Sequence, residues 1–486
     1  VKDPDTFRRV AEKAMRAGKP LIVTKVGKSA AGERAAASHT AALAGSYSTY
    51  QAMFRKYGII EGGDTDEMVE MAMGFSLFGH CLPKGKRVGI VTGSGGGGWM
   101  ADTCSLQGLE VPTLDAATRA VIDARIPAYG TSQNPVDGTA GAVREIGYAN
   151  LLGMVRDSES VDAVIGITSA RRASTYENER ANLTKLARET EKPVLIWSYT
   201  NPADEAVTSL SQIGLPLFTN NNNCARTLYE MSEYRAFRER FLRAPEIITG
   251  SSATKSSVKA ALDSANSVLC EYQARPVLAE YGISDGQARM AKSAQEAVDI
   301  AAGIDEPVAL KVQSPDILHK SEAGAVVLNL KTADDVRAAY DKIMASAKAY
   351  NSSADIHGVL VQPMAPAGQE MILGVNQDEK FGPILMVGLG GIYVEVLKDV
   401  AFSPVPFGTD DARRLLDQLK GAALLHGVRG EAPADIDALV DLMVGLSKFA
   451  ADHGEQIAEI DLNPVLVHPK GQGVSIADAL IVKSPS

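Results

Sequence analysis

Features that mark extracellular, membrane-bound or nucleic-acid-binding proteins are scarce in this sequence. Four cysteines occur among 486 residues, at positions 81, 104, 224 and 270, without a CxxC pair. Neither a disulfide framework nor a zinc knuckle is therefore expected, and core thiols in a reducing compartment are the simplest interpretation. No apolar run reaches the roughly 18 to 20 residues of a membrane span, and no signal-peptide pattern opens the chain. These absences predict a cytoplasmic protein without a membrane partner.

An excess of positive charge is also lacking. The net charge is -10, and Lys and Arg are scattered rather than gathered in a stripe, so a nucleic-acid partner is not expected. Apolar residues make up 45% and charged residues 22%, as in ordinary globular proteins. A chain of 486 residues is too long for one hydrophobic core, which predicts two to four domains.

In the first half of the chain, short apolar segments alternate with helical ones. A helix is expected over residues 3–17, and Asp64 with Glu67 forms a capping pair for a helix that Gly79 ends. Alternation of this kind predicts a parallel, doubly wound sheet covered on both faces. The expected strands are residues 20–26, 87–92, 161–168 and 193–199, and a charged helix should follow residue 223. Residues 81–85 and the Ser- and Thr-rich residues 249–259 are expected linkers.

After residue 260 the pattern changes to α+β. Residues 308–312 and 325–330 are expected to pair as neighbouring strands, which indicates antiparallel sheets. Expected helices are residues 332–350, 410–420 and 435–453.

Two histidines stand in segments that could carry chemistry. His39 lies among small residues, from Ser38 to Gly45, which would leave an imidazole open to a ligand. His319 lies in residues 314–324, at the tip of a predicted hairpin. The alternative for either residue is a histidine that merely packs or caps.

A glycine-rich run follows the predicted strand 87–92 and opens a helix. Unpaired backbone N–H groups and the positive end of the helix dipole at such a place favour an anion, so Ser94, Gly95, Gly96, Gly97 and Gly98 are predicted to bind phosphate. The run lacks the Lys-Ser/Thr of a Walker A loop, and a plain tight turn is the alternative.

Further candidates for a nucleotide site occur in the last third. Lys311, on a strand, could hold phosphates as a point charge. The strand 359–364, with Gln362 and Met364, is suited to backbone hydrogen bonds with an adenine edge, and Glu370 could hold a ribose hydroxyl. Oxygen ligands of the kind that Mg²⁺ takes with phosphate occur at Glu459, Asp461, Asn463 and Asp478.

Taken together, these motifs resemble the ADP-forming acyl-CoA synthetases, relatives of succinyl-CoA synthetase, and the resemblance covers essentially the whole chain. The segment Lys25 to Gly45 resembles the family's phosphohistidine segment, with Ala41 where the family usually has Gly. Residues 314–321 resemble the loop whose second histidine ferries phosphate to the nucleotide.

The resemblance implies flavodoxin-like, succinyl-CoA synthetase-like doubly wound domains followed by an ATP-grasp α+β domain. Residues 1–82 would be the C-terminal half of one flavodoxin domain, 85–245 a second one and 255–486 the ATP-grasp domain. By the same resemblance His39 and His319 are catalytic, Ser94 to Gly98 cradle phosphohistidine, Lys311 contacts phosphate and Glu370 belongs to the nucleotide lobe. Asn463 and Asp478 would bind Mg²⁺, assisted by Glu459 and Asp461.

The implied reaction is reversible conversion of acyl-CoA, ADP and phosphate into carboxylic acid, CoA and ATP through a phosphohistidine relay. ATP/ADP, Mg²⁺ and CoA are the implied cofactors and co-substrates. The family's CoA-binding domain should precede Val1, so a partner carrying that domain, or a homo-oligomer, is expected. Two alternatives remain: a non-catalytic nucleotide-binding fragment or subunit, and an ATP-grasp ligase for another carboxylate.

Overall fold

The computed structural model describes residues 1–29, 31–32, 47–93, 95–243, 256–264, 267–283, 288–391, 397–428 and 430–485. The chain divides into two units. The parallel-sheet unit consists of Asp5–Ala44 and Phe54–Ala244, and the antiparallel-sheet unit of Val1–Pro4, Gly45–Met53 and Pro245–Ser486. Within the described part of the chain, no helix is both long and apolar enough to cross a membrane.

The parallel-sheet unit begins with a two-stranded parallel sheet and its helices. Strand β1 (Ile22–Val23) pairs with β2 (Ile60–Glu61), so the strand expected over residues 20–26 is much shorter than predicted. The side chain of Asp64 accepts a hydrogen bond from the Glu67 N–H at 2.8 Å and starts helix α4 (Thr65–Phe78). Gly79 ends that helix, as expected. Helix α1 (Pro4–Arg16) lies here from Asp5 on, and α3 (Tyr47–Tyr57) is divided between the two units after Met53.

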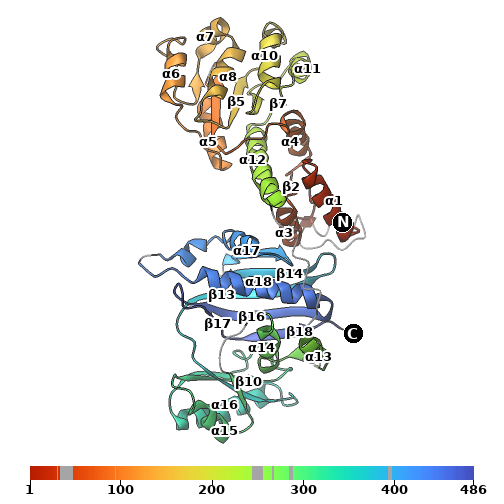
Figure 1. The fold of residues 1–486 in the computed structure, drawn as a ribbon, viewed down its shortest axis with the longest axis vertical. Coiled ribbons are helices and arrows are strands. Elements are labelled where there is room, and N and C mark those ends of the chain that lie inside the picture. The colour runs from red at the N-terminus through yellow and green to blue at the C-terminus, as the bar shows by residue number, and fades with distance from the viewer. Residues whose placement is uncertain are drawn as a thin grey trace. The chain divides into compact units, whose positions relative to one another are not determined.

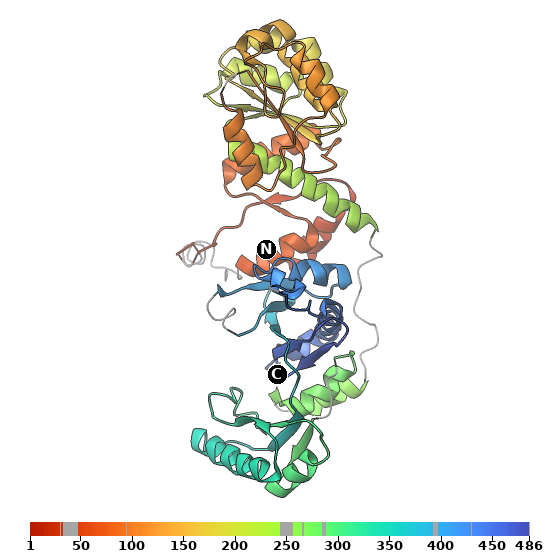
Figure 2. The same ribbon diagram turned by 90° about the vertical axis from the view of Figure 1, so that its left-hand side faces the viewer.

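A five-stranded parallel sheet forms the rest of this unit (Figure 1). Its order is β4-β3-β5-β6-β7, and Figure 2 shows helices on both faces, so the prediction of a doubly wound sheet is confirmed. The strands are β3 (Val88–Thr92), β4 (Val136–Asp137), β5 (Ala163–Thr168), β6 (Val194–Ser198) and β7 (Leu217–Phe218). The helices are α5 (Gly97–Leu106), α6 (Ala116–Asp123), α7 (Thr139–Ile146), α8 (Tyr148–Asp157), α9 (Ser174–Glu177), α10 (Arg180–Arg188), α11 (Asp204–Ile213) and α12 (Asn221–Arg243).

In the antiparallel-sheet unit the expected linker over residues 249–259 is partly wrong. Helix α13 (Ser256–Ser264) already includes residues 256–259. Val258 and Leu262 lie one helical turn apart and are both fully buried in the core, so packing of these two side chains outweighs the polar composition around them.

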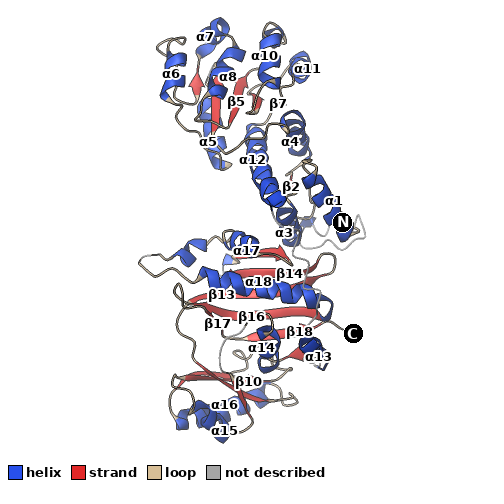
Figure 3. Cartoon of the chain, viewed as in Figure 1, coloured by secondary structure: helices blue, strands red, loops and turns tan. Residues whose placement is uncertain are grey.

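Two antiparallel sheets form this unit (red in Figure 3). The smaller has the order β11-β10-β12-β9, and the larger has β15-β14-β13-β16-β18-β8 with β17 beside β16. Strand β10 (Val308–Gln313) pairs with β11 (Val326–Leu330), as predicted, and with β12 (Gly358–Pro363). The remaining strands are β8 (Val268–Leu269), β9 (Arg289–Ala291), β13 (Gln369–Asp378), β14 (Gly382–Leu389), β15 (Val400–Pro404), β16 (Ile457–Val467), β17 (Val474–Ile476) and β18 (Ala479–Lys483).

Each antiparallel sheet has its own hydrophobic core and its own helices. Helices α15 (Ala294–Ala301) and α16 (Ala333–Tyr350) pack on the smaller sheet, while α18 (Ile436–His453) packs on the larger one. Helix α14 (Glu271–Ala279) packs against β18, and α17 (Thr409–Leu416) against β15 and α18. The sequence located α16, α17 and α18 correctly, although α17 is shorter than expected.

Candidate active site

A group of charged side chains in the antiparallel-sheet unit surrounds Lys311. This lysine lies within β10, on a strand as expected, and it is only 5% exposed. Its Nζ donates to Glu271 Oε1 at 3.3 Å, to Gln362 Oε1 at 3.0 Å and to the carbonyl oxygen of Ala477. Strand β12 supplies Gln362, helix α14 supplies Glu271, and the residue before Asp478 supplies the carbonyl. Three elements thus fix one ammonium group.

Glu271 and Arg275 complete this network from one face of α14. Arg275 Nη2 donates to Glu271 Oε1 at 2.5 Å, to Gln362 Oε1 at 3.2 Å and to the Ile476 carbonyl at 3.1 Å. The carboxyl group of Glu271 is fully buried, and burial raises its pKa, although the Lys311 ammonium opposes the effect. Neither residue was a candidate from the sequence. A Glu–Arg pair four residues apart is common on exposed helices and gave no signal of a buried site.

The acidic candidates converge on the strands beside this network. Glu459, Asp461 and Asn463 alternate along β16 and therefore share one face of the strand. The backbone N–H of Asn463 donates to the Asp478 carbonyl at 3.2 Å, which joins β16 to the start of β18. All four predicted metal ligands therefore lie on these two neighbouring segments.

Charges also accumulate in this acidic group. Burial, followed by the carboxylates of Asp478 and Glu459, raises the pKa of Asp461 to about 6. Burial would raise the pKa of Asp478, but the Lys320 and Lys311 ammonium groups hold it below its usual value. Negative charge of this density beside a lysine fits a magnesium nucleotide, since Mg²⁺ takes one or two carboxylates plus phosphate oxygens. Within the described ranges, no group of three or more His, Cys, Asp or Glu side chains is already arranged around a metal position.

His319 lies in the loop between β10 and β11 and is exposed. A protonated His319 imidazole would oppose the increase in the pKa of Asp461, although burial and the neighbouring carboxylates outweigh it. The next residue, Lys320, donates to Asp478 Oδ1 at 2.8 Å and to Oδ2 at 2.7 Å. The structure therefore places the predicted histidine, one predicted metal ligand and a lysine missed from the sequence in one neighbourhood.

Two other residues predicted to contact the nucleotide, Met364 and Glu370, lie outside the network around Lys311. The backbone N–H of Met364, just after β12, donates to the Pro307 carbonyl at 2.7 Å and is thereby engaged within the chain. Glu370 is exposed on β13 and lies beside Gly390 and Gly391 at the end of β14. Within the described residues, no side-chain hydrogen bond or ion pair joins Glu370 to Lys311 or Asp478. Its assignment to the nucleotide stays a prediction.

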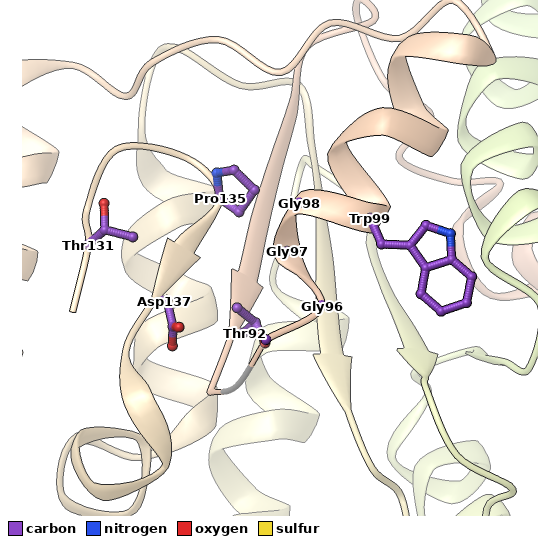
Figure 4. Close-up of a pocket in the computed structure, with 9 residues that line it drawn as sticks. Thr92, Gly96, Gly97, Gly98, Trp99, Thr131, Pro135 and Asp137 are labelled. Atoms are coloured by element: carbon purple, nitrogen blue, oxygen red, sulfur yellow. The ribbon is translucent and has the colours of Figure 1, made fainter. Parts of the chain in front are cut away.

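A second candidate site lies in the parallel-sheet unit. The glycine run follows β3, and α5 begins at Gly97 beside a cavity of about 510 Å³ (Figure 4). The first N–H groups of a helix have no partner within it, which favours an anion at such a place. The lining residues are Thr92, Gly95, Gly96, Gly97, Gly98, Trp99, Thr131, Pro135 and Asp137. Ser94 and His39, both predicted site residues, lie outside the described residues.

The segment from Asn134 to Asp137 owes its position at this cavity to the Asn134 side chain. The Asn134 amide accepts from the Ile90 N–H at 2.9 Å and donates to the carbonyls of Val88 and Pro112 at 3.0 and 2.7 Å. Asp137 in turn accepts from the Thr139 N–H at 2.8 Å. The asparagine thereby fastens the loop to β3, which the sequence did not reveal.

The fold and these two sites define a class of protein that joins an ATP-grasp domain to succinyl-CoA ligase-like domains. An ATP-grasp domain family matches residues 260–482, and the succinyl-CoA ligase like flavodoxin domain family matches residues 1–75. The chain is 35% identical over 479 residues to the ADP-forming acetate–CoA ligase I of Archaeoglobus fulgidus, covering 98% of this chain and 68% of that one. The chain belongs to the family of ADP-forming acetate–CoA ligases, as the resemblance implied.

Two further relatives match single parts of the chain. The beta subunit of the ADP-forming acetate–CoA ligase II of Pyrococcus furiosus is 42% identical over 225 residues, which is 46% of this chain and 95% of that subunit. A solved structure of Ca. Korarchaeum cryptofilum dinucleotide forming acetyl-coenzyme A synthetase 1, in complex with coenzyme A, Ca-AMPCP and HgCl+, is 38% identical. That match covers 48% of this chain and 100% of the other, with a TM-score of 0.45. Some members of the family are thus divided into separate subunits.

Proposed function

We propose that this chain carries out the phosphoryl-transfer steps of an ADP-forming acid–CoA ligase. In the complete reaction, acyl-CoA, ADP and phosphate are exchanged with carboxylic acid, CoA and ATP. The observation that carries the proposal is the convergence of Lys311, the His319 loop and the Asp478 region in one unit. These are a phosphate-binding cation, a nucleophile and oxygen ligands, which phosphoryl transfer requires together.

In the direction that consumes ATP, the neutral imidazole of His319 attacks the γ-phosphorus of ATP. An N–P bond forms, the P–O bond to the β-phosphate breaks, and ADP leaves with the electron pair. Lys311 would hold the phosphates, while Asn463 and Asp478 would hold Mg²⁺, with Glu459 and Asp461 nearby. Bound Mg²⁺ would neutralise phosphate charge. The residues themselves align donor and acceptor, which is where most of the catalytic effect of such enzymes arises.

For the remaining steps we propose that His39 exchanges the phosphoryl group with His319. The cavity beside α5 would hold this phosphoryl group, since its glycine run presents N–H groups at a helix start. CoA and the acyl group would be bound with the help of a CoA-binding domain on a partner, as the division of relatives into subunits supports. Four free, buried cysteines support a reducing compartment such as the cytoplasm.

The experiment that tests the proposal is incubation of the purified chain with γ-labelled ATP and Mg²⁺. Acid-labile, base-stable label is expected on the wild type and is expected to be absent from His319→Ala. His39→Ala should keep label on His319 and lose the second phosphohistidine. An unlabelled wild type that still binds ATP would contradict the proposal and favour a non-catalytic nucleotide-binding role.

A further inference from the structure

Lys320 occupies an unusual position for a loop lysine. It follows the exposed His319, yet it is only 6% exposed itself. Both carboxylate oxygens of Asp478 accept hydrogen bonds from its Nζ, at 2.8 and 2.7 Å. A buried ammonium group is tolerated only with such a partner, because removal from water penalises an unpaired charge heavily. The ion pair is therefore the main fixed point on this side of the loop.

The other side of the loop is fixed by packing. Ile317 is 1% exposed and belongs to the core of the smaller sheet. Asp478, the partner of Lys320, directly precedes β18 of the larger sheet. His319 thus stands between an apolar anchor in one sheet and an ionic anchor at the other. The two anchors hold the backbone on both sides of His319, while its own side chain is exposed.

We propose that Lys320 is a positioning residue, whose ion pair with Asp478 holds the His319 imidazole at the nucleotide site during phosphoryl transfer. This inference rests on the proposed function. Asp478 is held from several sides: Lys320 uses one site on each of its oxygens, and the Ala479 N–H lies 2.9 Å from Oδ1. The Glu271 side chain also acts on the pKa of the Asp478 carboxyl group.

The test compares K320M with K320R and with K331M, a control that removes an exposed lysine just after β11. Transfer of label from saturating γ-labelled Mg·ATP to His319 is measured, and Mg·ADP affinity is measured by calorimetry. K320M is expected to slow labelling about ten- to hundredfold, as misplacement of a reacting group does. Its Mg·ADP affinity should stay within about twofold of the wild type, since a positioning residue does not bind the nucleotide. K320R and K331M should label at close to the wild-type rate.

Each alternative result has a definite meaning. Equal labelling of K320M and wild type would overturn the role of Lys320. So would a Mg·ADP affinity that falls as far as the labelling rate, because Lys320 would then be a nucleotide ligand. An unlabelled wild type, by contrast, would refute the proposed function itself.

Hydrogen exchange tests the anchor without any nucleotide. In the wild type, amides of residues 316–324 are expected to exchange at least about tenfold more slowly than those of the exposed turn at residues 351–354. K320M should lose that protection while strand β10 keeps its own. Exchange of the wild-type loop as fast as the exposed turn would overturn the proposal, even if K320M does not fold.

Discussion

At the scale of single residues, Lys311 has a side chain that several groups hold in place. Its ammonium group contacts a carboxylate, an amide oxygen and a backbone carbonyl, all acceptors. An ammonium group has three N–H donors, so a phosphate oxygen would take the place of one of these acceptors on a cation that is already oriented. The cost of ordering a flexible lysine on binding is thereby reduced, which is the usual benefit of a prearranged site.

We predict that Lys311→Met weakens binding of Mg·ATP. Loss of a charge-assisted hydrogen bond costs about 1.5–3 kcal/mol, or roughly ten- to hundredfold in affinity. Calorimetric titration of the variant would measure the change. Lys342→Met, on the exposed side of α16, is the matched control and should bind as the wild type does. An unchanged affinity for Lys311→Met would show that this ammonium group serves Glu271 alone.

At the scale of elements, the glycines at the start of α5 differ in how much space surrounds them. A Cβ added to Gly97 would lie 2.8 Å from the Pro135 Cβ, a distance that forces a shift, whereas Gly98 has open space around it. Pro135 and the glycines line the same cavity (Figure 4). The close approach of the two segments therefore sets the width of the predicted phosphate site.

Gly97→Ala is expected to destabilise the parallel-sheet unit by about 1–3 kcal/mol, the usual cost of overpacking. Denaturant unfolding would measure this change. The variant should also weaken binding of inorganic phosphate, as displacement of Pro135 reshapes the cavity. Gly98→Ala, at the next position of α5, should leave both properties nearly unchanged. Equal effects of the two substitutions would argue against the packing explanation.

The loop that carries Pro135 has its own anchor in Asn134. We predict that Asn134→Ala costs about 2–4 kcal/mol, because three hydrogen bonds are lost and backbone groups of β3 lose their partner. Thermal and denaturant unfolding would show the loss. Gln133→Ala, with an exposed side chain at the neighbouring position, should be close to neutral. A neutral Asn134→Ala would mean that water replaces the side chain at β3.

At the scale of the whole molecule, the parallel-sheet unit has one hydrophobic core and each antiparallel sheet has its own. Residues that share one core unfold together, so more than one transition is expected on heating. A titratable group buried in one unit should change the pH dependence of the melting temperature of that unit alone. His453 of α18 is such a group: it is 3% exposed, and its Nε2 lies 3.0 Å from the Tyr281 hydroxyl.

We predict that His453 takes stability from the antiparallel-sheet unit as the pH falls below about 6.5, whereas Asp461, whose pKa is raised to about 6, adds stability as the pH falls through that value. Burial lowers the pKa of His453, although Asp452 opposes the effect, so the unfolded state takes up protons before the folded state does. Calorimetry between pH 5 and 7.5 would follow the transitions. Compared with the wild type, His453→Gln should lose less stability in one transition between pH 7.5 and pH 5, while the exposed His426→Gln should behave as the wild type does. The same pH dependence in His453→Gln and in the wild type would assign the effect to another group.

The sequence by itself determined the elements and much of the local chemistry of this protein. Alternating apolar segments specified the parallel sheet, because strand and helix periodicities are local properties of the chain. The pair of Asp64 and Glu67 and the position of Gly79 likewise bounded α4. Lys311, His319 and the acidic residues near the C-terminus were candidates because their residue types fit phosphate and metal chemistry.

Only the tertiary structure decided which of these residues meet. Glu271 precedes Lys311 by 40 residues, and Lys320 precedes Asp478 by 158, so no local pattern relates them. Their pairing follows from the way β10, α14 and β18 approach one another. Burial then makes each charge depend on its partner, because a charged group removed from water must be paired. The sequence determines the identity of each side chain, but burial and long-range pairing arise only when the chain has packed.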